Sequence, residues 1–195
     1  MNLPNRLTVA RIIMTPLFMA AMLIKFPFHY LVALILFAIA SFTDMLDGKI
    51  ARARNIITNF GKFLDPLADK MLTTSAFIGF LALGFGEGIV WVLFIVLFRE
   101  FMVSSLRLVV VSSDPTKVIA ANIYGKIKTV TQMAAIIFGL LVMTFTTEIW
   151  PACPSAISSV LYIIFNVLMW VSTIAAVISG IIYMKDSFEF IDPSK

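Results

Sequence analysis

Long apolar segments alternate with short polar segments along nearly the whole chain. Each apolar segment has the length of about 20 residues that a helix needs to cross a hydrocarbon layer roughly 30 Å thick. Glycine, proline and charged residues interrupt them, for example at Gly84–Gly88 and Ser112–Lys117. The pattern predicts six transmembrane helices, at about residues 7–25, 30–54, 59–83, 89–111, 120–145 and 157–184.

Composition supports a membrane protein rather than a soluble domain. Of the 195 residues, 61% are hydrophobic and only 13% are charged, whereas soluble domains are about 25% charged. A chain this short cannot bury so many apolar residues in a soluble core. We therefore expect an all-α integral membrane protein that forms one domain over residues 1–195.

The basic residues indicate an orientation in the membrane. Of the 15 lysines and arginines, all but Lys25 and the central Arg99 fall on the side that holds both predicted termini and the 52–60 turn. The positive-inside rule places that side in the cytoplasm. A polar site at these helix ends would then open toward the cytoplasm.

Four aspartates within residues 44–69 are the most unusual feature of the apolar pattern. A charged side chain in the middle of a bilayer costs roughly 2.5–3.5 kcal/mol on insertion scales, so such groups are candidates for function. On helices, two sets of residues each share one face: Asp44, Asp47, Gly48, Ala51 and Arg52 in the first, and Gly61, Asp65 and Asp69 in the second.

The short linker between these two segments predicts antiparallel neighbouring helices, with the carboxylates paired at two matching depths. Four like charges so close together require cations. The cluster has oxygen donors and no His or Cys, a set that suits one or two Mg²⁺ or Mn²⁺ ions better than zinc. The glycines leave room for a ligand to approach the helices.

The same stretch resembles the signature of the CDP-alcohol phosphotransferase family, D-x2-D-G-x2-A-R-x8-G-x3-D-x3-D, with every defined position and gap matched. The opening Pro4-Asn5-x-Leu7-Thr8-x-x-Arg11 also resembles the start of bacterial members.

A second polar cluster follows on two later segments. Arg99-Glu100 falls near the middle of the predicted helix at 89–111, Arg107 lies two turns later, and Gly125-Lys126-Ile-Lys128-Thr129 opens the next helix. Arginine suits bidentate phosphate contacts, and lysine acts as a point charge. Two other interpretations remain open: Arg99 and Glu100 can form a structural ion pair, and the lysines can be helix-end residues attracted to anionic lipid.

This order of residues resembles the branch of the family that uses glycerol 3-phosphate as acceptor. The resemblance implies displacement of CMP from CDP-diacylglycerol by an alcohol, with Asp44, Asp47, Asp65 and Asp69 as metal ligands and Asp69 also as general base. It further implies that Gly48, Arg52 and Gly61 bind CDP-diacylglycerol. Glycerol 3-phosphate would contact Arg99, Arg107 and Lys126, and Lys128 is a further candidate.

The resemblance also implies a homodimer in the bacterial cytoplasmic membrane, and no nucleic-acid partner is expected. Other acceptors, such as inositol phosphate or serine, stay open, although the cations favour a phosphorylated one. A divalent-cation transporter is an alternative from another class, because acidic helices also line ion pathways. Gly48, Ala51-Arg52 and Gly61 have no evident use in transport.

Overall fold

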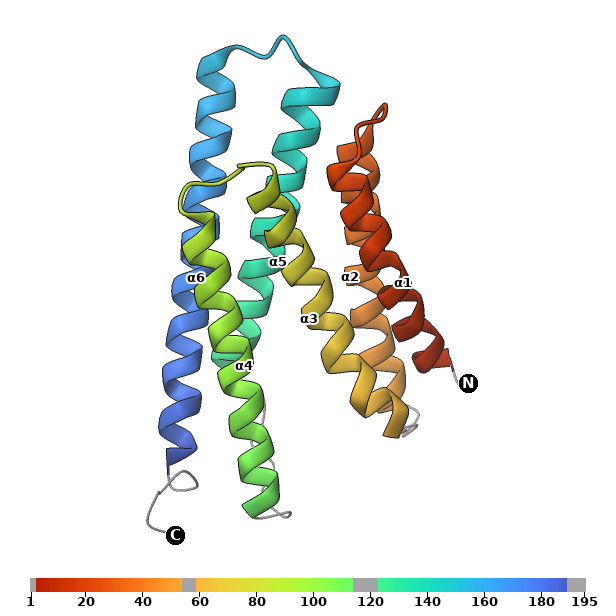
Figure 1. The fold of residues 1–195 in the computed structure, drawn as a ribbon, viewed down its shortest axis with the longest axis vertical. Coiled ribbons are helices and arrows are strands. Elements are labelled where there is room, and N and C mark those ends of the chain that lie inside the picture. The colour runs from red at the N-terminus through yellow and green to blue at the C-terminus, as the bar shows by residue number, and fades with distance from the viewer. Residues whose placement is uncertain (1–2, 54–58, 114–122, 189–195) are drawn as a thin grey trace. The chain divides into compact units, whose positions relative to one another are not determined.

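The computed structural model describes residues 3–53, 59–113 and 123–188, and at positions 3–4, 45–53, 59–60, 62–63, 65 and 111–113 it describes the backbone but not the side chain. Every regular element within these ranges is a helix (Figure 1). They are α1 (Leu3–Leu23), α2 (His29–Ala53), α3 (Asn59–Ala82), α4 (Ile89–Ser113), α5 (Ile123–Thr144), the π-helix η1 (Phe145–Ile149) and α6 (Ser155–Asp186). The predicted all-α architecture and its helix order are confirmed.

Helix boundaries differ from the predicted ones mainly at two places. Helix α1 begins at Leu3 rather than near residue 7, because Pro4 falls in the first turn, where its missing N–H is tolerated. The segment around Glu148 was predicted to be a loop, but η1 extends the helix to Ile149. The hydroxyls of Thr146 and Thr147 donate to the carbonyls of Val142 (2.7 Å) and Met143 (2.5 Å), so these polar residues remain compatible with a helix.

The predicted turn between the third and fourth helices is confirmed. Gly84, Gly86 and Gly88 all have positive φ, at 64°, 117° and 70°, a conformation that glycine adopts without a steric penalty. At Gly88 a Cβ atom would also lie 2.8 Å from Cζ2 of Trp170.

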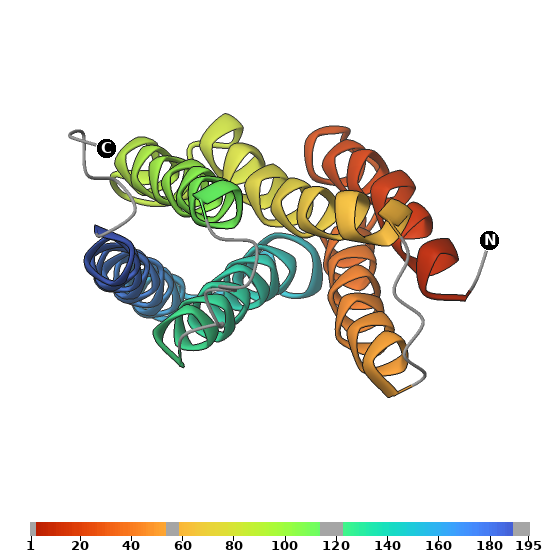
Figure 2. The same cartoon turned by 90° about the horizontal axis from the view of Figure 1, so that it is seen from below.

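The chain divides into two compact units, Met1–Glu87 with Ile136–Phe165 and Gly88–Ala135 with Asn166–Lys195. In the first unit, α1 packs against both α2 and α3 (Figures 1 and 2), and α2 runs antiparallel to its two neighbours. Close approach depends on small residues: a Cβ on Gly79 would lie 2.5 Å from Sδ of Met22. The Phe18 and Phe37 rings, with centroids 5.5 Å apart, fill the space between α1 and α2.

The second unit packs part of α5 and α6 against α4. Helix α4 buries one stripe at i, i+4 and i+3 spacing: Val92, Val96, Arg99, Val103, Leu106 and Val110. Arg99 therefore occupies a position where the pattern otherwise places aliphatic side chains. Gly180 of α6 faces it, and a Cβ there would lie 3.1 Å from Cγ of Arg99.

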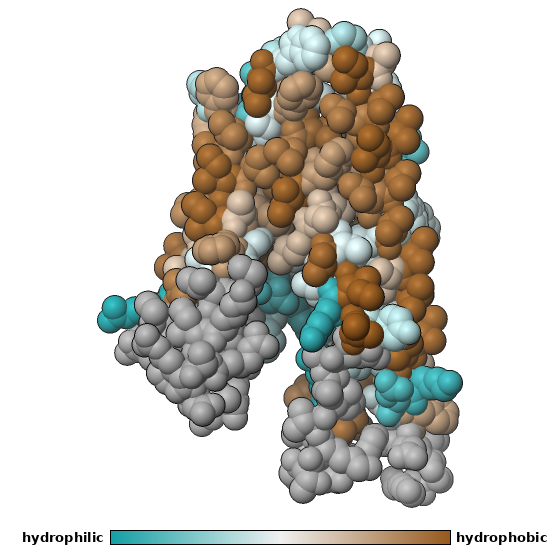
Figure 3. All heavy atoms as spheres, turned by 180° about the vertical axis from the view of Figure 1, so that it is seen from behind, coloured by the Kyte–Doolittle hydropathy of each residue, from teal (hydrophilic) through white to brown (hydrophobic). Residues whose placement is uncertain are grey.

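The outward faces of the helices are apolar. Many large hydrophobic side chains are exposed, among them Phe94, Phe101, Ile163 and Ile181, and hydrophobic residues cover much of the described surface in Figure 3. Such an exterior is stable in lipid but not in water. The protein is thus a multi-pass membrane protein.

Four stretches of the described residues are long and apolar enough to cross a membrane: Asn5–Leu23, Ile89–Val110, Ile123–Ile149 and Ser155–Asp186. Within the part of α2 whose side chains are described, the apolar stretch His29–Asp44 is shorter. Spanning by α2 and α3 therefore stays a prediction.

A carboxylate from η1 closes the N-terminus of α2 within the first unit. Glu148 accepts hydrogen bonds from the backbone N–H groups of Tyr30 (2.6 Å, to Oε1) and Leu31 (3.0 Å, to Oε2). The first N–H groups of a helix have no partner within the helix, and their partial positive charge attracts an anion. Glu148 thus links two segments that are 118 residues apart.

We predict that Glu148→Ala lowers the stability of the protein in detergent by about 1–3 kcal/mol, since two charge-assisted hydrogen bonds are lost. Glu148→Gln keeps one acceptor oxygen and should have a smaller effect. The measurement is the apparent melting temperature at a fixed heating rate. Equal melting temperatures for Glu148→Ala and the unmodified protein would contradict this role.

Candidate functional site

The predicted aspartate segment lies in the first unit, at the end of α2 and the beginning of α3. Asp44 lies on α2, with its side chain 36% exposed, and Asp69 is half-buried on α3. Gly61 is buried in the first turn of α3. Asp47, Gly48 and Arg52 belong to α2 and Asp65 to α3, but their side chains lie outside the described residues. That the carboxylates of the two helices pair at two matching depths therefore stays a prediction.

Asp44 forms an ion pair with Arg11 of α1, which is 0% exposed. Sequence reasoning named Arg11 as part of the opening motif and missed this contact. A signal was present, because the buried polar residues of α1 lie on one face at helical spacing: Asn5, Thr8, Arg11 and Thr15. Helix α1 therefore supplies a positive charge to the carboxylate segment.

The donor set at this segment fits a hard divalent cation. Four aspartates offer only oxygen ligands, as Mg²⁺ and Mn²⁺ prefer. Asp44 is partly accessible, and its negative charge is compensated by the guanidinium group of Arg11. Among the residues with described side chains, no group of three or more His, Cys, Asp or Glu comes together, and this set excludes Asp47 and Asp65.

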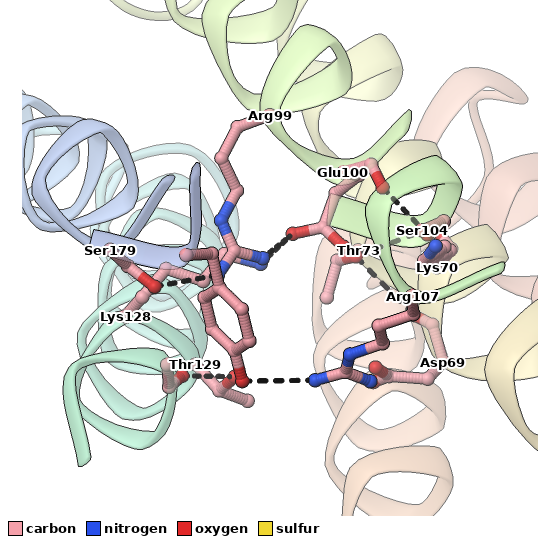
Figure 4. A network of polar contacts seen from close by, with 12 residues as sticks. Asp69, Lys70, Thr73, Arg99, Glu100, Ser104, Arg107, Lys128, Thr129 and Ser179 are labelled. Atoms are coloured by element: carbon pink, nitrogen blue, oxygen red, sulfur yellow. Dashed lines mark hydrogen bonds and ion pairs between the residues drawn. The ribbon is translucent and has the colours of Figure 1, made fainter. Parts of the chain in front are cut away.

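The second unit contains a network of charged side chains at Arg99, drawn in Figure 4. Arg99 is 8% exposed, and its Nη1 donates to Oε1 of Glu100 at 3.0 Å. Lys128 of α5 forms an ion pair with the same carboxylate oxygen. Glu100 thus bridges two cations, which supports the ion-pair interpretation for this residue.

The other two predicted cations of this cluster are more accessible. Arg107 is exposed on α4, and its Nη2 donates to the hydroxyl of Tyr183 at 3.0 Å. Lys126 is exposed on α5, whereas Lys128 is buried. The structure therefore brings Lys128, rather than Lys126, into contact with the Arg99–Glu100 pair.

Helix α6 contributes two residues that sequence reasoning did not identify. Ser179 accepts a hydrogen bond of 2.6 Å from Nη2 of Arg99, and Tyr183 contacts Arg107. Both are buried and lie one turn apart on α6, whose buried residues are mostly apolar. Polar residues at i and i+4 on such a face were the signal that could have indicated them.

The cluster has an electrostatic preference for an anion. Arg99, Arg107 and Lys128 carry three positive charges and Glu100 carries one negative charge, so the four residues together carry a net charge of +2. Low dielectric surroundings strengthen this field relative to water. A phosphate group with about two negative charges complements it, and arginine offers the planar donors that phosphate oxygens accept.

Comparison with known proteins gives the same direction. A family model described as CDP-alcohol phosphatidyltransferase matches residues 1–182. A CDP-diacylglycerol--glycerol-3-phosphate 3-phosphatidyltransferase of Bacillus subtilis (strain 168) is 38% identical, over 99% of this chain and 98% of its own length. The protein of that name from Rickettsia bellii is 35% identical over 94% of each chain. A probable phosphatidylglycerophosphate synthase of Mycobacterium tuberculosis is 37% identical, over 94% of this chain and 80% of its own.

We predict that Arg11→Met lowers stability in metal-free detergent by up to about 3 kcal/mol, because the ion pair of Asp44 with Arg11 is lost. Arg6→Met, at an exposed position of the same helix, should change the melting temperature little and serves as the control. The double variant Arg11→Met/Asp44→Asn should recover part of the loss, since neither charge remains. Additive effects of the two substitutions would contradict a direct ion pair.

Proposed function

The chain belongs to the CDP-alcohol phosphatidyltransferase family, and on this basis we propose that it transfers the phosphatidyl group of CDP-diacylglycerol to sn-glycerol 3-phosphate. The products are phosphatidylglycerophosphate and CMP, and the reaction belongs to phosphatidylglycerol biosynthesis. The observation that carries this proposal is the similarity, over 94–99% of the chain, to relatives with this named activity. The cationic cluster of the second unit supports a phosphorylated acceptor.

In the proposed reaction, a hydroxyl oxygen of glycerol 3-phosphate forms a bond to the phosphorus of the phosphatidyl group. The bond from that phosphorus to the CMP oxygen breaks, and CMP leaves with the electron pair. Asp69 takes the proton from the attacking hydroxyl. A carboxylate can act as a general base if it lies within hydrogen-bonding distance of that proton.

Asp44, Asp47, Asp65 and Asp69 would hold one or two Mg²⁺ or Mn²⁺ ions. When bound, the metal neutralises the charge of the diphosphate and of the departing CMP. Arg52 contacts a phosphate of the nucleotide, and Gly48 and Gly61 leave space for the nucleotide beside the helix backbones. The buried position of Gly61 is consistent with a tight approach at α3.

Arg99, Arg107 and Lys126 bind the phosphate of glycerol 3-phosphate in this proposal, together with Lys128. The burial of Lys128 and its contact with Glu100 favour Lys128 over Lys126 for the inner part of this pocket. A serine acceptor would bring no phosphate dianion to complement the net charge of +2 on this cluster. Inositol phosphate fits the charge equally well, so acceptor competition must separate the two.

The membrane arrangement in this proposal has six spans, with both termini and the active site on the cytoplasmic side of a bacterial cytoplasmic membrane. The excess of Lys and Arg at these helix ends supports it, and it also favours anionic lipid. The enzyme works as a homodimer, as the family resemblance implies. A transporter remains the alternative outside this class, and it would move Mg²⁺ without releasing CMP.

We predict that purified protein releases CMP from CDP-diacylglycerol only when glycerol 3-phosphate and Mg²⁺ or Mn²⁺ are present. EDTA should abolish the release because it removes these ions. The four aspartates offer no soft ligand that would retain another metal in their place. Asp44→Asn, Asp47→Asn and Asp65→Asn should each be inactive but still insert into membranes. Release with inositol phosphate or serine instead would show that the acceptor is that alcohol and not glycerol 3-phosphate. Release in metal-free buffer would contradict the metal role.

We further predict that Asp69→Asn lowers kcat by about 10²–10⁴-fold, the usual contribution of a general base. The decrease should be larger if Asp69 also binds metal. Binding of CDP-diacylglycerol should change less than turnover. Asp186→Asn, at an exposed carboxylate near the end of α6, is the matched control, and near-normal turnover in Asp69→Asn would exclude it as the base.

A further inference from the structure

Tyr183 is buried on α6, with 2% of its surface exposed, and it contacts both arginines of the second unit. Its hydroxyl accepts a hydrogen bond of 3.0 Å from Nη2 of Arg107. The Cζ atom of Arg107 lies 5.4 Å from the centre of the Tyr183 ring, and Cζ of Arg99 lies 5.7 Å from it. One aromatic side chain therefore has two guanidinium groups within cation–π distance.

This arrangement restricts side chains that would otherwise be mobile. Arg107 is exposed on α4, and a free arginine side chain loses up to about 2 kcal/mol of conformational entropy when it is fixed. The two guanidinium groups also repel each other. The negative face of the ring offsets part of that repulsion, and the hydroxyl selects one orientation of Arg107.

The same turn of α6 fixes the deeper arginine. Ser179 Oγ accepts from Nη2 of Arg99 at 2.6 Å. Gly180 has no side chain, which lets α6 approach α4 closely at Cγ of Arg99. One turn of α6, residues 179–183, therefore contacts both arginines of α4.

Each arginine keeps N–H groups for a further ligand. A guanidinium has five N–H donors, and the tyrosine takes one from Arg107. The Nε atom of Arg99 is buried and has no hydrogen-bond partner within the described part of the chain. A buried donor without a partner is unfavourable, so an incoming oxygen atom would be stabilised there.

We propose that Tyr183 is a positioning residue for the acceptor: it orients Arg107 and, with Ser179, Arg99, so that both guanidinium groups meet the phosphate of the acceptor alcohol. This inference rests on the proposed function, in which that phosphate belongs to glycerol 3-phosphate. Tyr183 itself does not contact the reacting atoms. Its effect appears in acceptor binding and depends on Arg107.

Tyr183→Phe tests this directly, because it removes the hydroxyl and keeps the ring in the core. The initial rate of CMP release is measured against each substrate, with the other saturating, in mixed micelles. We expect the KM for glycerol 3-phosphate to rise about tenfold, the equivalent of one hydrogen bond to a charged group. The KM for CDP-diacylglycerol should stay within about twofold. Ser179→Ala should change the acceptor KM in the same direction.

Tyr162→Phe is the matched control. Tyr162 lies on the same helix, and its hydroxyl also accepts one hydrogen bond, from the backbone N–H of Gly86 at 3.3 Å. This bond belongs to the first unit and involves no arginine. Its loss should leave the KM for glycerol 3-phosphate unchanged, which separates loss of a tyrosine hydroxyl in general from loss of this one.

A double-mutant cycle separates positioning from packing. Arg107→Ala alone should lower kcat/KM for glycerol 3-phosphate tenfold or more, as expected for one charge-assisted contact of about 1.5–3 kcal/mol. If Tyr183 acts through Arg107, then Tyr183→Phe in the Arg107→Ala background should lower kcat/KM by less than about twofold further. A packing role would give the full tenfold loss in both backgrounds.

The outcomes are distinct. An unchanged acceptor KM in Tyr183→Phe, or additive effects in the cycle, would overturn the positioning role while the proposed function stands. Equal increases in the KM values of both substrates would overturn it too, because they indicate general distortion. A wild-type protein without CMP release that depends on glycerol 3-phosphate would overturn the proposed function, and this inference with it.

Discussion

Charge compensation in an apolar environment is the constraint on which the polar parts of this protein depend. Lipid offers no water to solvate a buried charge or an open backbone group, so each needs a partner from the chain or from a ligand. Asp44 has Arg11, Glu100 has Arg99 and Lys128, and the open N-terminus of α2 has Glu148. Asp44 and the N-terminus of α2 have their partners on other helices. Glu100 has one partner on its own helix and one on α5.

This constraint explains why the helices were predictable from sequence and their partners were not. Hydropathy and turn residues define the six helices within a few positions, because lipid requires long apolar segments and glycine permits the turn at residues 84–88. The ion pair of Arg11 with Asp44 depends on which helices become neighbours. Periodicity gives the face on which Arg11 lies, but not the helix that it meets.

The candidate site follows the same division. The aspartate segment could be proposed as a site from spacing alone, because four carboxylates at helical intervals favour a shared cation. Ser179 and Tyr183 could not be identified with a site in the same way, since serine and tyrosine are common in membrane helices and carry no charge. Their importance depends on Arg99 and Arg107, which are 80 and 76 residues away in sequence. The preference for Lys128 over Lys126 was also beyond sequence reasoning, because the two lysines lie about half a helical turn apart and the packing of α5 decides which of them reaches Glu100.

Glu100 unites the two interpretations that the sequence left open, a structural ion pair and a phosphate site. Without this carboxylate, Arg99 and Lys128 would be two like charges in a buried position, and burial of unpaired charge is unfavourable. With it, the pair is stable without ligand, yet the four charged residues still carry a net charge of +2. The carboxylate therefore does not compete with an anion for all of the positive charge. It leaves a net positive charge that a phosphate dianion would complement, so that in the proposed function the same ion pair would serve both the stability of the helices and the binding of an acceptor.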